Sequence, residues 1–491
     1  MKPNQTSKET KSNNSRRNFI KNTMLAATGF YIVPRHVLGR GFVAPSDKLL
    51  IAGIGAGGKG GDDIRQFAKN PHAVIAYLCD VDDRQAEENR KLFPKAKYYK
   101  DWRELMDKES KNFDAVSVGT PDHNHAIITH RAMQLKKHVY VQKPLTHDIY
   151  EAKVLGDAAQ KYKVVTQMGD QGASGDGVRT MMEWYEAGLI GDIEEIDIWT
   201  NRPVWPQGIQ WPNSSLNIPK ELDWDLWLGT APQKDYVENL VPFNWRGWWD
   251  YGTGALGDMG CHLIGPAFKV LELGFPTEVY CSVSTFYDGI FKQAFYPESG
   301  PASSAVHFKY QLKNGKEVKL NWMDGGIQPE RPEELSINES MSLPDDKGNG
   351  AIFRGTKGKM LYGTYGRGPR LLSKDAAAKA SSIAQKYPRV PGSDSGHYSQ
   401  WVEACLAGYE KGHKMVSSPF EEYAVPLTES ILMGNLAIRS FNLKTTNAEG
   451  KTQFPGRDIT LNWDAQNLRV TNFEAANQFV KRTYRNGWGE I

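Results

Sequence analysis

The stretch "IAGIGAGGKGGD", residues 51–62, decides the fold, because its glycines are either a flexible linker or a tight turn that binds phosphate. The apolar run Leu49–Ile54 leads into it and predicts a buried strand. The segment "GKGGDDIRQFAKN" follows and predicts a helix, with Ile64, Phe67 and Ala68 at helical spacing. A linker is not enclosed between a strand and a helix, so we interpret the run as a strand-to-helix turn.

The glycines of this turn have the spacing G-x-G-x-x-G, and an acidic residue follows at the distance that a dinucleotide site requires. Asp80 ends the second strand-like run, "HAVIAYLCDVD", 22 residues after Gly58. The turn lets the backbone approach a pyrophosphate, and the helix N-terminus favours the anion. A carboxylate at Asp80 accepts from a ribose 2′-OH and repels a 2′-phosphate. The sequence predicts NAD as cofactor in preference to NADP, bound by Gly53, Gly55, Gly58 and Asp80.

The alternation of strands and helices continues beyond this turn. It predicts a doubly wound parallel sheet in a domain that spans residues 46–168. Ligands bind at the carboxyl ends of such strands, so the loops "GTPDHNH" (119–125) and "QKPL" (142–145) are predicted to line the cofactor crevice. The further strands are expected at Ala115–Val118, His138–Val141 and Val164–Met168.

A second domain is predicted for residues 169–491, and its candidate strands differ in character. Val306, Phe308 and Tyr310 alternate with polar residues, as in a strand with one buried face. The candidate strands are "EEIDIWTN", "TEVYCSVSTFY", "SSAVHFKYQL", "EVKLNWMD" and "AIFRGTKGKMLYG".

Five motifs occur in a fixed order: the glycine turn, Asp80, "GTPDHNH", "QKPL" and "GDMGCHLIG" at 257–265. In this order they resemble the glucose–fructose oxidoreductase and inositol 2-dehydrogenase family (Gfo/Idh/MocA), over nearly all of the chain after residue 45. The resemblance implies an α/β protein with an N-terminal Rossmann domain and a C-terminal α/β domain that contains a large, mostly antiparallel open sheet. It also implies an NAD-dependent oxidoreductase acting on a sugar, glycoside or polyol, and we expect a homo-oligomer.

The resemblance further implies roles for single residues. Lys143 would lie beside the nicotinamide and assist proton transfer at the substrate hydroxyl, although its position alone favours a surface lysine at a turn. Asp258 and His262 share one face if their segment is helical, and the resemblance makes His262 the general acid/base. Gln142 replaces the usual Glu, which removes a carboxylate. The implied catalytic residues are Lys143, Asp258 and His262, and the implied cofactor-binding residues also include Thr120, Pro121, His125 and Lys143.

Alternatives remain for several of these side chains. Asp258 and His262 can instead form a structural pair or bind a metal. The cluster of Asp122, His123 and His125 also suggests a metal, but the resemblance places this loop beside the nicotinamide and substrate, so no metal is predicted. Eight of the fourteen tryptophans fall between positions 199 and 249. They indicate either a carbohydrate cleft or a core of packed rings.

Three functions follow in order of preference. The first is an oxidoreductase that acts on a carbinol carbon. The second is a glycosidase or lyase that oxidises the sugar transiently, which would cleave glycosides without net release of reduced cofactor. The third is a sugar-binding protein without activity, against which the retention of Lys143, Asp258 and His262 argues.

The N-terminal 45 residues differ from the rest. "SRRNFIKNTMLAATGFYIVP" has a twin arginine before a short apolar run, which predicts a twin-arginine signal and linker over residues 1–45 and export to the periplasm. The apolar run is too short to span a bilayer, so no stable membrane insertion after export is expected. The net charge of +3 comes without any long basic block, and we therefore expect no nucleic-acid partner.

Overall fold

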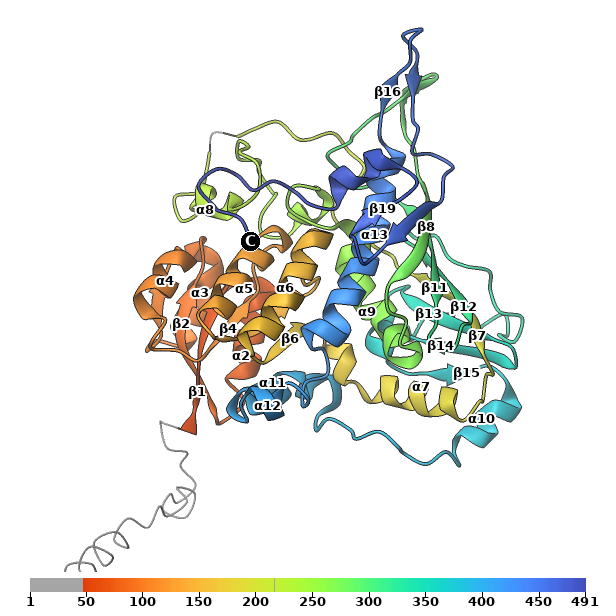
Figure 1. The fold of residues 1–491 in the computed structure, drawn as a ribbon, viewed down its shortest axis with the longest axis horizontal. Coiled ribbons are helices and arrows are strands. Elements are labelled where there is room, and N and C mark those ends of the chain that lie inside the picture. The colour runs from red at the N-terminus through yellow and green to blue at the C-terminus, as the bar shows by residue number, and fades with distance from the viewer. Residues whose placement is uncertain (1–46, 216) are drawn as a thin grey trace, which may run out of the picture. The chain divides into compact units, whose positions relative to one another are not determined.

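The glycine turn joins the first strand and helix of a six-stranded sheet in this computed structural model, which describes residues 47–215 and 217–491 (Figure 1). All six strands are parallel, in the order β3-β2-β1-β4-β5-β6. The order reverses between β1 and β4, which opens a crevice at their carboxyl ends. The strands are β1 (Leu49–Ile54), β2 (Ala73–Cys79), β3 (Lys97–Tyr99), β4 (Ala115–Val118), β5 (His138–Gln142) and β6 (Thr166–Gly169).

Five helices connect these strands. The predicted strands and the helix after the glycine turn are confirmed. No element is predicted from the sequence for residues 83–99, but the structure has a helix and an edge strand there. This segment is strongly polar and has no apolar run that would indicate a buried helix or strand. The helices are α2 (Gly58–Phe67), α3 (Asp83–Leu92), α4 (Trp102–Glu109), α5 (His125–Gln134) and α6 (Ile149–Tyr162).

The C-terminal half builds a nine-stranded sheet, and the predicted fold class is confirmed. Only β7 and β12 pair in parallel; the other neighbours are antiparallel. The last two strands come from the C-terminal segment and extend one edge. In sheet order the strands are β15 (Arg370–Leu371), β14 (Gly358–Tyr362), β13 (Gly350–Gly355), β7 (Ile193–Trp199), β12 (Glu317–Met323), β11 (Ser304–Gln311), β8 (Pro276–Val283), β18 (Leu461–Asp464) and β19 (Arg469–Val470).

Two long apolar helices connect the two sheets. α13 (Val425–Phe441) contacts α6, α9 (Gly254–Leu271) and β8, and Figure 1 shows it running between the two layers. Nearly every side chain of α9 and α13 is buried, as expected for helices that are apolar on all sides. The remaining helices are α7 (Asp176–Glu186), α8 (Trp224–Leu228), α10 (Lys374–Ala380), α11 (His397–Leu406) and α12 (Tyr409–Gly412), and two small ribbons pair β9 (Tyr287–Gly289) with β10 (Lys292–Gln293) and β16 (Thr445–Thr446) with β17 (Thr452–Gln453).

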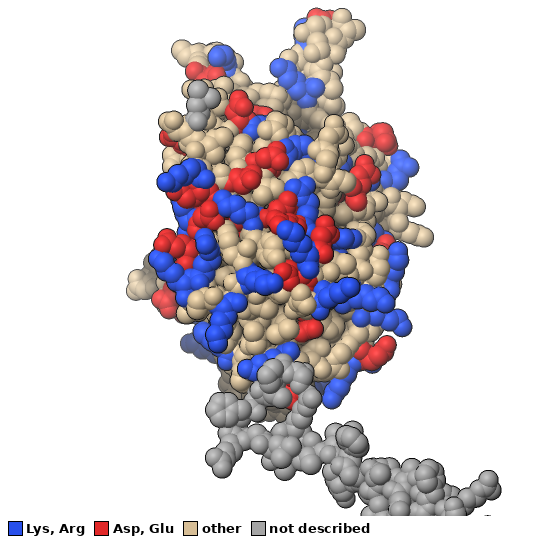
Figure 2. All heavy atoms as spheres, turned by 90° about the vertical axis from the view of Figure 1, so that its left-hand side faces the viewer, with Lys and Arg blue, Asp and Glu red and all other residues tan. Residues whose placement is uncertain are grey.

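Basic and acidic side chains are interspersed on the face that Figure 2 shows, so no large area of this face carries one sign of charge. Ion pairs such as Lys91 with Glu87 on α3 compensate the charges locally. All four cysteines are buried, and none forms a disulfide. Within residues 47–215 and 217–491 no helix has both the length and the apolar character that a bilayer crossing needs. The predicted export signal lies outside the described residues.

Three glycines let the turn pack directly against the neighbouring loop. A Cβ on Gly60 would lie 2.2 Å from the carbonyl oxygen of Gly55, and a Cβ on Gly119 would lie 2.3 Å from Cα of Gly60. Gly55 also has φ of +84°, which favours glycine. The backbone contact between the start of α2 and the end of β4 therefore depends on Gly60 and Gly119, neither of which belongs to the G-x-G-x-x-G motif.

Replacing Gly60 with alanine should destabilise the protein, because the added Cβ cannot be accommodated without a backbone shift. Overpacking of this kind costs about 1–3 kcal/mol. Urea unfolding of Gly60→Ala should show this loss, whereas Gly358→Ala, whose Cβ would meet its nearest neighbour at 3.8 Å, should unfold like the wild type. Equal midpoints for all three proteins would contradict the close approach.

Candidate active site

A cavity of about 520 Å³ lies at the carboxyl ends of β1, β4 and β5, and the second half of the chain forms its other wall. All but one of the residues predicted for cofactor binding or catalysis line it. The exception is Gly53, which lies beneath the turn, where a Cβ would meet Cδ1 of Ile64 at 2.4 Å. The predicted residues on the cavity wall are Gly55, Gly58, Asp80, Thr120, Pro121, His125, Lys143, Asp258 and His262.

Asp80 stabilises the glycine turn as well as facing the cavity. Its Oδ2 accepts from the backbone N–H of Gly57 (3.0 Å), and its Oδ1 accepts from that of Asp82 (3.0 Å). Burial raises the pKa of Asp80 to about 6, against the backbone hydrogen bonds, which lower it. A carboxylate has lone pairs beyond these two bonds, so further hydroxyl donors can still be accepted.

Lys143 and Asp258 join the two walls of the cavity. Lys143 Nζ, just after β5, donates to Oδ1 of Asp258 (3.0 Å) and to the backbone carbonyl of the same residue on α9. Burial would raise the pKa of Asp258, but the charges of Lys143 and then Arg246 outweigh it and hold this pKa well below its usual range. Asp258 is therefore an anion throughout the physiological range.

His262 pairs with Asp170, not with Asp258, which lies one turn earlier on the same helix. Nδ1 of His262 lies 3.0 Å from Oδ1 of Asp170, and Oδ2 of Asp170 accepts from Tyr423 (2.7 Å). The ring of His262 packs on that of Tyr365, with centroids 4.5 Å apart. Burial, and after it the charge of Lys143, lowers the pKa of His262. Among the described residues no group bonds to Nε2, so a neutral imidazole can offer this nitrogen to the cavity.

The histidines of the 119–125 loop have structural partners. His123 lies outside the cavity, with its ring nitrogens 3.2 Å and 3.0 Å from the carbonyls of Tyr251 and Trp227. His125 lines the cavity, but its ring bridges the carbonyls of Thr120 and Pro144 (2.8 and 2.9 Å), which ties this loop to the "QKPL" loop. In the described part of the chain no three His, Cys, Asp or Glu side chains form a group that could hold a metal ion.

The side chain of Gln142, at the end of β5, contacts the carboxylate of Asp63 on α2. Gln142 Nε2 donates to Oδ2 of Asp63 (2.5 Å), whose other oxygen accepts from Lys59 (2.5 Å) and Tyr398 (3.0 Å). Asp63 is fully buried, and Lys59 lies at the cavity wall. This network connects the glycine turn, the end of β5 and α11. The partners lie 79 and 335 residues apart, so no local pattern could have revealed it.

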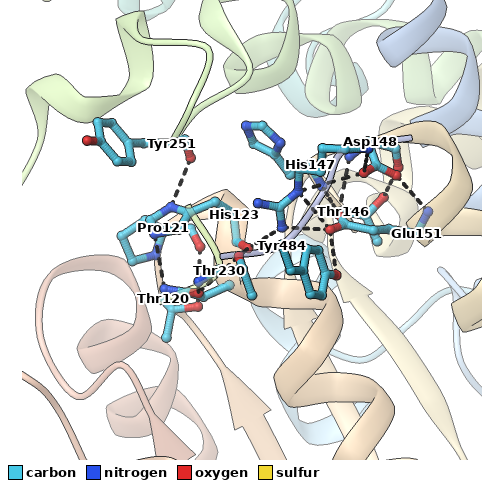
Figure 3. Close-up of polar contacts among 12 residues, drawn as sticks. Thr120, Pro121, His123, Thr146, His147, Asp148, Glu151, Thr230, Tyr251 and Tyr484 are labelled. Atoms are coloured by element: carbon cyan, nitrogen blue, oxygen red, sulfur yellow. Dashed lines mark hydrogen bonds and ion pairs between the residues drawn. The ribbon is translucent and has the colours of Figure 1, made fainter. Parts of the chain in front are cut away.

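The C-terminal segment supports the 119–125 loop from outside the cavity. Arg482 donates to Oε1 of Glu151 on α6 (2.6 Å) and to the carbonyl of His123 (2.5 Å). Tyr484 donates to the same oxygen of Glu151 (2.7 Å), and Figure 3 shows Tyr484 and Glu151 next to this loop. No local sequence pattern indicates this role of Arg482, because its partners are more than three hundred residues away.

Most of the tryptophan-rich segment forms a core. Trp224 and Trp227 stack at 4.8 Å, and a cluster of buried aromatic and aliphatic side chains surrounds them. Of the eight tryptophans between 199 and 249, only Trp211 is not buried. Only Trp227 and Trp245 of this group reach the cavity. The packing alternative thus describes most of these rings.

Two family models match the chain. One, described as an oxidoreductase family with an NAD-binding Rossmann fold (Gfo/Idh/MocA), covers residues 49–170. The other, the C-terminal α/β domain of the same oxidoreductase family, covers residues 200–285. They match in the order expected for one two-domain protein.

Curated relatives align over part of their length. Levoglucosan dehydrogenase of Pseudarthrobacter phenanthrenivorans is 24% identical over 194 residues, which cover 40% of this chain and 42% of that protein. Glycosyl hydrolase family 109 protein 1 of Shewanella sp. strain ANA-3 is 27% identical over 188 residues, covering 35% of this chain and 40% of that protein. The chain therefore spans about two fifths of the length of these relatives.

The solved structures share the fold. The WlbA dehydrogenase from Chromobactrium violaceum, crystallised with NADH and UDP-GlcNAcA, superposes with a TM-score of 0.54 at 14% identity, covering 81% of this chain and 95% of that one. The likeness at this identity concerns the arrangement of the two sheets and their helices.

The Gln142–Asp63 contact makes a prediction with a distinct pH signature. Gln142→Glu would place a second carboxylate about as close to Asp63 as the amide is now, at 2.5 Å. The two carboxylates cannot both ionise, so the folded state would hold a proton that the unfolded chain releases. The free energy of unfolding should then fall as pH rises from about 5 to 8, by at most about 1.4 kcal/mol per pH unit.

The matched control exchanges the two groups. Asp63→Asn combined with Gln142→Glu restores one donor and one carboxylate at the contact, so it should recover most of the lost stability. Chemical denaturation of the wild type, both single variants and the double variant at several pH values gives the coupling free energy. Additive losses without a pH trend would contradict the contact.

Proposed function

We propose that this chain is a member of the Gfo/Idh/MocA oxidoreductases, whose two family models match residues 49–170 and 200–285, and that it is an NAD-dependent oxidoreductase acting on a carbinol carbon of a sugar, glycoside or polyol. The observation that supports this most directly is the meeting of Lys143, Asp258 and His262 in the cavity that also contains the glycine turn. A proton-transfer group thus lies in the same cavity as the expected cofactor position.

The residues at the turn fit a dinucleotide. A Cβ on Gly58, which lines the cavity, would meet nothing within 4 Å, so space for a ligand lies directly over the backbone. The N-terminus of α2 favours the pyrophosphate, and Asp80 favours an unmodified ribose. When bound, NAD supplies the hydride acceptor.

The protein's own part is to hold the substrate and move a proton. Asp170 keeps the proton on Nδ1 of His262, so Nε2 of the neutral ring can take the proton of the substrate hydroxyl. Lys143 is fixed by Asp258 and places a positive charge where negative charge develops on that oxygen. Asp258 cannot compete for the proton, because its pKa lies well below its usual range.

A second candidate is cleavage of a glycoside through transient oxidation of the sugar. The match to a glycosyl hydrolase family 109 protein favours it. The same residues would serve both reactions, because each begins by removing the proton of a ring hydroxyl. The two functions differ in products: an oxidoreductase accumulates reduced cofactor and ketone, whereas the hydrolase releases free sugar without net change in the cofactor.

Incubation with a panel of sugars and glycosides, with cofactor absorbance and products followed together, tests the proposal. Lys143→Met and His262→Gln should each lose about 10²–10⁴ in turnover while retaining nucleotide. Lys91→Met, which removes an exposed lysine on α3, is the matched control. Since the pKa of His262 is lowered from 6.5, kcat/KM should be flat above pH 6.5 and fall only below it. Near-wild-type turnover in both site variants, or no turnover of any member of the panel, would overturn the proposal.

We also propose that the twin-arginine signal exports the folded protein to the periplasm with its nucleotide already bound. The surroundings of an exported protein lack a ready pool of NAD, so a weakly held cofactor would be lost by dilution. The nucleotide would then act as a prosthetic group that a second substrate, or the return step of the same reaction, regenerates. Residues from both halves of the chain line the cavity, so a bound nucleotide would have contacts with both, which supports slow release.

The nucleotide content of the protein tests this retention. Protein isolated from the periplasm without added cofactor should, on denaturation, release close to one nucleotide per chain. That nucleotide should be NAD, because Asp80 disfavours a 2′-phosphate. Substoichiometric release together with activity that requires added NAD would contradict retention, and release of NADP would contradict the role of Asp80.

A further inference from the structure

Two arginines approach Asp258 without forming close ion pairs with it. Arg202, in the loop after β7, has Nε 3.5 Å from Oδ2 of Asp258, and Arg246 has Nε 3.4 Å from Oδ1. Charge-assisted hydrogen bonds are typically about 2.7–2.9 Å long. Lys143, at 3.0 Å, already provides the close partner of this carboxylate. The arginines are therefore not required for pairing Asp258.

Both guanidinium groups have unused donors at the cavity wall. Arg202 donates through Nη1 to Asn201 (2.6 Å), and Arg246 donates through Nη1 to the carbonyl of Phe243 (3.1 Å). Among the described residues neither makes another hydrogen bond, and Nε of Arg202 is buried without a hydrogen-bond partner. A guanidinium carries five donors, so most donors of both groups remain available to a ligand.

The packing of Arg246 fixes its position in advance. Its guanidinium lies 4.3 Å from the ring centroids of both Phe243 and Trp245, in cation–π geometry. The side chain is only 20% exposed, and that of Arg202 is 25% exposed. Side chains held in this way lose little conformational freedom on binding, which favours affinity.

Three cationic side chains approach the one carboxylate of Asp258, with nitrogen–oxygen distances of 3.0, 3.5 and 3.4 Å. Lys143, Arg202 and Arg246 surround the single carboxylate of Asp258. Nearby, Asp122 is engaged by Thr253 (2.7 Å), and burial raises its pKa, which weakens it as a counter-ion. A ligand with a negative charge would complete this arrangement.

We propose that Arg202 and Arg246 form a carboxylate-binding subsite, so that the substrate is a sugar acid or a glycoside of one. This inference rests on the proposed function and specifies its substrate class. Arginine binds planar carboxylates through paired N–H donors, and a carboxylate adds the single negative charge that suits this end of the cavity. Because both arginines contact the residue that fixes Lys143, the carboxylate lies at the same end of the cavity as the reacting hydroxyl.

Calorimetric titration of the nucleotide-loaded protein with matched sugars tests the subsite. Glucuronic and galacturonic acid should bind about tenfold or more tightly than glucose and galactose, since a charge-assisted hydrogen bond contributes about 1.5–3 kcal/mol. The methyl esters of these acids should lose the advantage. Glucose 6-phosphate and glucose 6-sulfate are included to separate a carboxylate site from a general anion site.

Variants locate the effect. Arg202→Gln and Arg246→Gln should each reduce the preference for the acid over the neutral sugar by about tenfold, with neutral sugars affected little. Arg469→Gln removes an exposed arginine on β19 and should change neither affinity. Unfolding temperatures show whether each variant folds. If Arg246→Gln does not fold, Arg246→Lys replaces it, because lysine keeps the charge but loses the paired donors.

Three results would overturn the subsite: equal binding of acids and neutral sugars, tighter binding of the phosphate or sulfate ester than of the uronic acid, or an acid preference that survives both glutamine variants. Turnover separates this failure from that of the proposed function. If neutral sugars reduce the cofactor as well as acids do, only the subsite fails. If no sugar of either kind is turned over, the oxidoreductase proposal fails.

Discussion

The ion pair of Lys143 with Asp258 determines how the two halves of this protein form one site. Lys143 follows a strand of the parallel sheet, and Asp258 lies on the helix that packs against the large sheet. Each of the two side chains is 13% exposed. Removing one partner of a buried pair leaves an uncompensated charge, which typically costs about 3–5 kcal/mol. The relative position of the two walls is thus coupled to this ion pair, and the proposed proton chemistry would depend on the same contact.

Buried carboxylates elsewhere in the molecule follow the same rule of local compensation. Asp63 has Lys59, Gln142 and Tyr398, and Asp170 has His262 and Tyr423. Asp63, which accepts from Gln142, places one buried carboxylate beside the end of β5.

The fold class could be predicted from the sequence because the patterns that indicate it lie within short segments. β1 and β4 have the bounds expected from their apolar runs, and the glycine turn was identified from the strand and helix that flank it. All of the predicted site residues except Gly53 also line one cavity, since they follow strand ends or share one helix. The remaining partners of the site were not predictable in this way. Asp170 contacts a histidine 92 residues later, and Arg482 contacts a loop 359 residues earlier. Contacts between residues so far apart produce no periodic pattern in the sequence, so they can be found only when the packing of the helices is known.

The electrostatics of the cavity connect the proposed chemistry with the proposed substrate. In the proposed reaction the positive charges of Lys143, Arg202 and Arg246 would lower the cost of developing negative charge on a substrate oxygen. Burial, and after it the charge of Lys143, lowers the pKa of His262, which favours the neutral ring that the proposed base requires. A neutral substrate would leave part of this positive charge without a partner, at a desolvation cost that grows as the cavity fills. In the proposed complex an anionic substituent would remove that cost on binding, while Lys143 would stay paired with Asp258 beside the reacting hydroxyl. The proposed reaction and the proposed substrate therefore depend on the same three cations. Asp258 neutralises part of their charge and holds them in place, and an anionic ligand would neutralise more of it.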